Sequence, residues 1–180
     1  TVRISQEMGH NGLAVLPGIG IGVNQHIIVD GSRDAAFNLP TSVWQIDRIT
    51  NNIGIRVSNP TGSAVFISGA GGENNTLRWM EVGPVGTTAN IGDVHGIQLL
   101  NLTRMSNLLI EYCWIHDVQN DGINLNSVTI QPDSWDALQV RWCLIERTGD
   151  DGIQSVRNGF TLSHSFLRDH YLELYNGHPD

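Results

Sequence analysis

Carboxylate side chains gather at two turns of this sequence that resemble each other. The first turn places Asp121 before Gly122, and the second places Asp150 and Asp151 before Gly152. Clustered carboxylates repel, so one of them should keep its proton to higher pH. Such clusters serve as general acids and bases, or as oxygen ligands of Ca²⁺. The alternative is structural, because Asp-Gly is a favoured turn pair whose aspartate accepts backbone N–H groups.

The two turns belong to a sequence repeat. Residues 107–123 align with residues 137–153 without a gap, and related units run from residues 74 and 160. The spacing between units is 33, 30 and 22 residues. Each unit reads as two short strands with alternating apolar positions, and no segment has a helical period. Strands that recur in this way stack in parallel coils, with equivalent residues about 4.8 Å apart. A propeller or sandwich would instead need tight antiparallel hairpins.

Stacking places equivalent residues in columns. One column would hold the carboxylates together with His95 and Glu173. A second column consists of carboxamides that alternate with the inward isoleucines and should therefore face solvent: Gln98, Asn124, Gln154 and Asn176. Such a track either binds sugar hydroxyls or satisfies itself. A third column contains Cys113 and Cys143, which we expect to be buried soft side chains, although a disulfide between them is geometrically conceivable.

The repeat resembles the right-handed parallel β-helix of the pectin-lyase-like superfamily. The residues that carry the resemblance are Leu108–Ile123, Leu138–Ile153, Phe160–Leu174 and, more loosely, Leu77–Ile97. The resemblance implies an all-β solenoid of about six coils, forming one domain over residues 1–180. We expect residues 1–25 to be less regular, residues 26–180 to form the coils, and the chain to be a segment of a longer helix.

Within that superfamily the sequence is partly similar to polygalacturonase-type glycoside hydrolases. The matching segments are Asn120-Asp121-Gly122, Thr148-Gly149-Asp150-Asp151 and Gly177-His178-Pro179. The similarity implies inverting hydrolysis, with Asp151 as the acid, Asp121 or Asp150 as the base, and His178 tuning the acid. Nothing matches the Arg-Ile-Lys motif that binds the substrate carboxylate in that family. A Ca²⁺-dependent polysaccharide lyase is the weaker alternative, and the hydrolase itself requires no cofactor or metal.

Composition narrows the choice of partner. The 180 residues carry a net charge of −8 and contain no lysine, which excludes nucleic acid as a partner. No apolar run is long enough to span a membrane. Trp114 and Trp142 are candidates for stacking on sugar, although such tryptophans fit lateral packing equally well.

The sequence therefore predicts an extracellular or cell-surface β-helix that acts on or binds polysaccharide. The alternative is a non-catalytic fibre, adhesin or tailspike-like stalk. Such a rod would assemble into an oligomer or filament through its coil ends or lateral faces.

Overall fold

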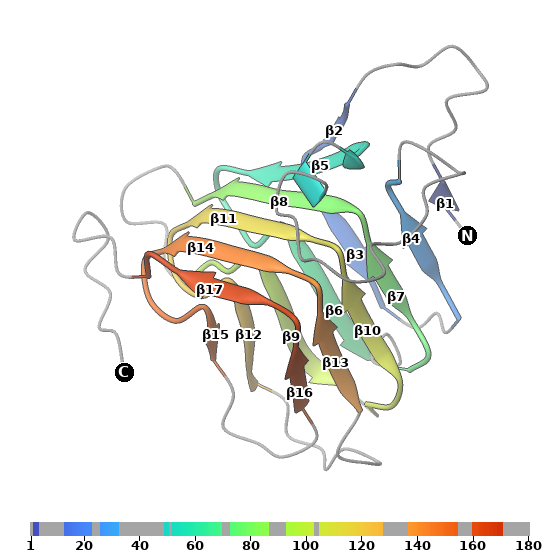
Figure 1. The fold of residues 1–180 in the computed structure, drawn as a ribbon. Helices are drawn as coiled ribbons and strands as arrows, with labels where there is room; N and C mark the ends of the chain where they lie inside the picture. Colours follow the sequence, from blue (N-terminus) through green and yellow to red (C-terminus); the bar gives the residue numbers. More distant parts are fainter. Residues whose placement is uncertain are drawn as a thin grey trace.

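The computed structural model shows a right-handed parallel β-helix of about six coils (Figure 1). The structure describes the following residues: 2–3, 13–22, 26–32, 49–50, 52–69, 73–86, 93–102, 105–127, 137–154 and 160–170. Among the described strands every ladder is parallel, so the fold expected from the repeat is confirmed and the hairpin architectures are excluded.

Every third strand of the chain falls in the same sheet, so each of the first five coils contributes one strand to each of three sheets, and the described residues of the sixth coil contribute β16 and β17 to two of them. Sheet A contains β1 (Val2–Arg3), β4 (Ile28–Asp30), β7 (Thr76–Arg78), β10 (Leu108–Glu111), β13 (Leu138–Arg141) and β16 (Phe160–Ser163). Sheet B contains β2 (Ala14–Leu16), β5 (Ile55–Asn59), β8 (Met80–Val85), β11 (Trp114–Val118), β14 (Leu144–Thr148) and β17 (Phe166–Arg168). Sheet C contains β3 (Ile19–Ile21), β6 (Val65–Gly69), β9 (Ile97–Leu102), β12 (Ile123–Ser127) and β15 (Ile153–Gln154).

The register of the coils follows the spacing of the repeat. Trp114 pairs with Glu81 on one side and with Leu144 on the other, and Leu144 pairs with Phe166. These pairs are 33, 30 and 22 residues apart, as the repeat predicts. Strands β2 and β3 lie within residues 1–25, the part expected to be less regular, and they pair with β5 and β6. The stacked strands therefore begin before residue 26.

The core consists of inward columns of apolar side chains. In sheet B one such column is Val57, Val82, Ile115 and Ile145, all with no exposed surface. Burial of each aliphatic side chain stabilises the fold by about 1.5–3 kcal/mol. Cys113 and Cys143 lie in the core as free thiols, not as a disulfide. Burial raises the pKa of Cys113 well above its ordinary value, so this thiol stays protonated.

The corner between sheets A and B carries a column of residues with positive φ. Trp79, Tyr112, Trp142 and His164 have φ values of 55°, 53°, 55° and 49°. Positive φ is uncommon for bulky side chains. Here the rings stack, with centroids 4.5 Å apart between Trp79 and Tyr112 and 4.3 Å apart between Trp142 and His164. Stacking on the next coil therefore accompanies the unusual backbone conformation at each corner.

No helix in the described part of the chain has the length and apolar character to cross a membrane.

Candidate functional site

The carboxylates lie in the turns that lead from sheet B to sheet C. Strand β12 pairs with β9 and β15, so the turns before these strands lie above one another. The N–H of Gly122 donates to the carbonyl oxygen of Asp151 at 2.9 Å, and the N–H of Gly96 donates to that of Asp121 at 3.0 Å. Asp121 and Asp151 are therefore vertical neighbours on successive coils, as the repeat predicts.

Asp121, Asp150 and Asp151 form a cluster that we call the acidic corner. One oxygen from each carboxylate can be chosen so that all three lie within 4.8 Å of one another. Asp121 is only 1% exposed, whereas Asp150 and Asp151 are half-buried and reach solvent. Three carboxylates this close offer proton donors and acceptors, and their oxygens are also the donor type that Ca²⁺ prefers.

Asp121 has a structural role in this cluster. Its Oδ1 accepts a hydrogen bond from the N–H of Asp151 at 3.2 Å, and its Oδ2 accepts one from Nδ2 of Asn124 at 2.6 Å. Nδ1 of His95 lies 3.1 Å from the same Oδ2. Asp121 therefore accepts a backbone N–H, as the turn interpretation expects, but the donor lies on the next coil. Asp150 and Asp151 are more exposed than Asp121, so they are better placed to meet a ligand.

The carboxamide column exists, but it does not form an open track. Asn124 pairs in register with Gln98 and Gln154, and its Nδ2 donates to Oε1 of Gln154 at 2.8 Å. Oε1 of Gln98 accepts a hydrogen bond from Oγ of Ser63 at 2.9 Å. Asn124 is only 3% exposed, so the expectation that this column faces solvent is wrong at Asn124. Its amide protons bind other protein groups.

The two predicted tryptophans use their rings within the protein. Trp114 stacks on His116 with centroids 3.9 Å apart, and its Nε1 donates to Oε1 of Glu146 at 3.0 Å. Trp142 stacks between Tyr112 and His164. Both tryptophans are half-buried, so only part of each ring is open to a ligand.

Sequence reasoning missed a histidine near the acidic corner. Nδ1 of His170 lies 2.7 Å from Oγ1 of Thr148, at the end of β14. Burial lowers the pKa of His170, and the negative charges of Asp151 and Asp169 partly oppose this effect. The spacing of 22 residues between the last two units places His170 over Thr148, so the repeat contained the signal. His178, the histidine expected from sequence, lies outside the described residues, as do Glu173 and Asn176.

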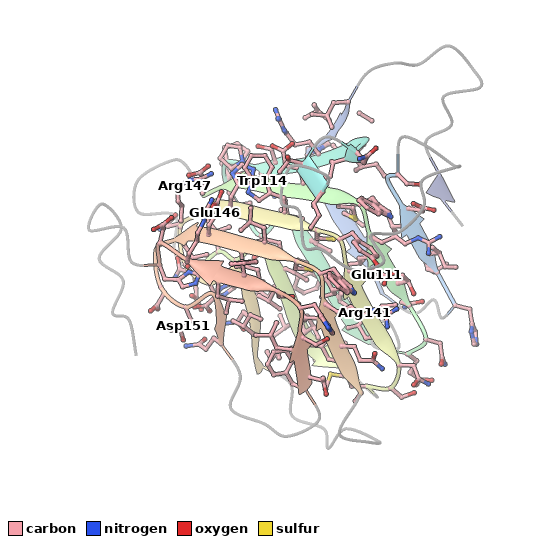
Figure 2. All side chains as sticks on the ribbon, viewed as in Figure 1. Glu111, Trp114, Arg141, Glu146, Arg147 and Asp151 are labelled. Atoms are coloured by element: carbon pink, nitrogen blue, oxygen red, sulfur yellow. The ribbon has the colours of Figure 1, made fainter. Side chains whose placement is uncertain are left out.

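A network of charges on sheet B was also missed. Arg147 binds Asp117 through Nε at 2.7 Å, and His116 lies between Asp117 and Glu81. The hydrogen bond from Arg147 lowers the pKa of Asp117 to about 2. Burial would raise the pKa of Glu146, but hydrogen bonds from Arg168, Trp114 and Arg147 lower it. Figure 2 labels Glu146 together with Trp114 and Arg147. These carboxylates remain ionised at neutral pH, so they act as ion-pair partners and cannot donate protons.

A second ladder of charges lies on sheet A. Arg78 binds Asp30 at 3.0 Å. Arg141 binds Glu111 at 2.9 Å, and Figure 2 labels these two residues. The four residues are paired in register on successive coils, with the sign of the charge alternating from coil to coil. If a strand paired with the next coil but one, residues of like charge would face each other. The alternating charges therefore favour the observed order of the coils.

Comparisons of the chain with protein-family models, with curated proteins and with solved structures found no match. The class of protein is therefore defined by geometry alone. It is a parallel β-helix with carboxylates at the turns between two of its sheets.

Proposed function

We propose that this β-helix acts on an acidic polysaccharide outside the cell or at its surface, as a glycoside hydrolase. The observation that carries the proposal is the acidic corner, where two coils bring three carboxylates within 4.8 Å of one another. Kinship with the polygalacturonase-type enzymes of the pectin-lyase-like superfamily is part of the proposal. The Gly149-Asp150-Asp151 segment supports this kinship, because it is similar to the Gly-Asp-Asp segment of that family and its two aspartates are half-buried in the acidic corner.

Asp151 is the proposed general acid, and Asp150 is the proposed base that activates water. Asp121 was also predicted from the sequence as a base. Its carboxylate instead accepts a hydrogen bond from the N–H of Asp151 and so holds the turn of Asp151 in place. Inverting hydrolases separate their two carboxyl groups by about 6.5–9.5 Å to leave room for water. The oxygens of the acidic corner approach more closely, so inversion requires the side chains of Asp150 and Asp151 to turn apart when substrate binds.

The test is the release of reducing ends from polygalacturonate and other acidic polysaccharides. Removal of a general acid or base costs about 10²–10⁴ in rate, so Asp150→Asn and Asp151→Asn should each lose that much. Asp169→Asn is the matched control, because Asp169 is an exposed carboxylate on the next coil. Equal rates of hydrolysis for the wild type and Asp151→Asn would refute the proposed hydrolase activity. EDTA should leave the rate unchanged, and a loss would indicate the Ca²⁺-dependent lyase instead.

A non-catalytic rod is the second candidate function. On the sixth coil Leu162, Phe166 and Leu167 are 39%, 46% and 38% exposed. Exposed apolar side chains of this kind suit stacking with another copy of the chain in an oligomer or filament. Sedimentation over a range of concentrations tests this role. Association that Leu167→Asp abolishes supports it, and a monomer at every concentration argues against it.

A further inference from the structure

Thr148 connects the acidic corner to His170. Thr148 ends β14, has no exposed surface, and donates its hydroxyl proton to the carbonyl oxygen of Asp150 at 3.1 Å. Oγ1 of Thr148 also lies 2.7 Å from Nδ1 of His170. A hydroxyl group has only one proton to donate. With this proton donated to Asp150, the oxygen accepts a hydrogen bond from His170, which places the ring proton on Nδ1.

This tautomer leaves a free lone pair on the other ring nitrogen. Nε2 of His170 is buried and makes no hydrogen bond with any described residue. A Cβ atom on Gly152 would lie 2.8 Å from Nε2, so the absence of a side chain there allows the ring to lie against the turn that follows Asp151. Buried acceptors without a donor are rare in folded proteins and call for an explanation.

The charges around the ring come from the acidic corner and from its own coil. Asp151 and Asp169 both favour the protonated ring, with Asp151 having the larger effect, but burial outweighs them and lowers the pKa of His170. The ring is therefore uncharged at neutral pH. An uncharged neighbour stabilises the carboxylate form of Asp151 less than an imidazolium would.

We propose that Thr148 and His170 are positioning residues of the acidic corner. Thr148 holds the carbonyl of Asp150 and fixes the tautomer of His170, so that an uncharged ring with a free Nε2 lies beside the turn of Asp151. The consequence for catalysis rests on the proposed function. With this ring beside it, Asp151 can hold the proton that a general acid must donate.

The tautomer can be tested by nitrogen NMR of histidine-labelled protein, with His170→Gln to assign the signal. The wild type should show the Nδ1–H tautomer above neutral pH. Thr148→Val keeps the shape but removes the hydroxyl, and should give a mixture of tautomers, whereas Thr148→Ser should restore the wild-type signal. A wild-type ring protonated on Nε2, or a Thr148→Val variant with an unchanged signal, would overturn the proposal.

The coupling to the acidic corner has its own measurement. Asp151→Asn removes a charge that raises the pKa of His170, so this pKa should fall, and it should fall less in the control Asp169→Asn. Equal pKa values in the wild type and Asp151→Asn would contradict the proposed contact.

The catalytic consequence appears in the pH profile of hydrolysis. Thr148→Val should lower kcat/KM roughly tenfold, the effect of one lost hydrogen bond, and shift the pH profile, while Thr148→Ser keeps both. An active Thr148→Val variant with the wild-type profile refutes the positioning role. If the wild type hydrolyses no polysaccharide, the proposed function fails, and the NMR measurements still decide the tautomer and the contact.

Discussion

Substitution of Gly122 by alanine tests the stacking of the coils. A column of glycines lies at the turns between sheets B and C on three successive coils. It consists of Gly96, Gly122 and Gly152. A Cβ atom on Gly122 would lie 2.6 Å from the carbonyl oxygen of Gly152 and 2.7 Å from Cγ2 of Ile145. The oxygen belongs to the backbone of the next coil, so the contact can be relieved only if the coils move apart.

The expected cost follows from two opposing effects. Overpacking a well-packed interior costs about 1–3 kcal/mol. Replacing glycine by alanine also restricts the unfolded chain, which returns about 0.4–1 kcal/mol. We therefore expect Gly122→Ala to lower the free energy of unfolding by about 1–2 kcal/mol. Gly20→Ala is the matched control, because nothing lies within 4 Å of a Cβ atom there. The control should be neutral or slightly stabilising.

Urea unfolding measures this difference. With a slope of about 2 kcal/mol per molar urea, the midpoint of Gly122→Ala should fall by roughly 0.5–1 M, while that of Gly20→Ala should not fall. If both variants unfold at the wild-type midpoint, Gly152 does not lie directly over Gly122, and the stacked register is refuted.

Three further predictions concern stability and reactivity. The pKa of Asp117 is about 2 in the folded protein and 3.8 ordinarily, so its pairing with Arg147 stabilises the fold above about pH 4 and is lost as the pH falls through 2. The free energy of unfolding, measured with urea, should therefore fall less between about pH 4 and pH 2 in Asp117→Asn than in the wild type. Thiol reagents should modify Cys113 only after denaturation, and rapid labelling of the native protein would contradict its burial. Tyr112→Ala should cost about 3–5 kcal/mol of unfolding free energy, because Tyr112 is buried and stacks on both neighbouring coils; a loss below 1 kcal/mol would argue against the stack.

The register of the fold could be predicted because the inward residues of each coil meet the same neighbours. Ile115 and Ile145 occupy equivalent positions in the alignment and pair in the structure. The interior accepts only apolar side chains of similar size, so the pattern persists although the loops between units differ in length.

The outward residues could not be predicted in this way. Glu81, Trp114 and Leu144 share one column that alternates with the inward one, and they differ in charge and size although Glu81 and Leu144 are both buried. The burial of Asn124 depends on contacts to residues on two other turns, which alternation alone does not report. His170 was missed because the last coil resembles the others least, and only the spacing of the repeat pointed to it.

We propose that Asp150 and Asp151 act together as one catalytic pair. The most direct test is the rate of polysaccharide hydrolysis by Asp150→Asn, Asp151→Asn and the double variant. Residues that act as a unit give non-additive losses, so the double variant should be no slower than the slower single variant. Losses that multiply, or a single variant with the wild-type rate, would contradict the claim.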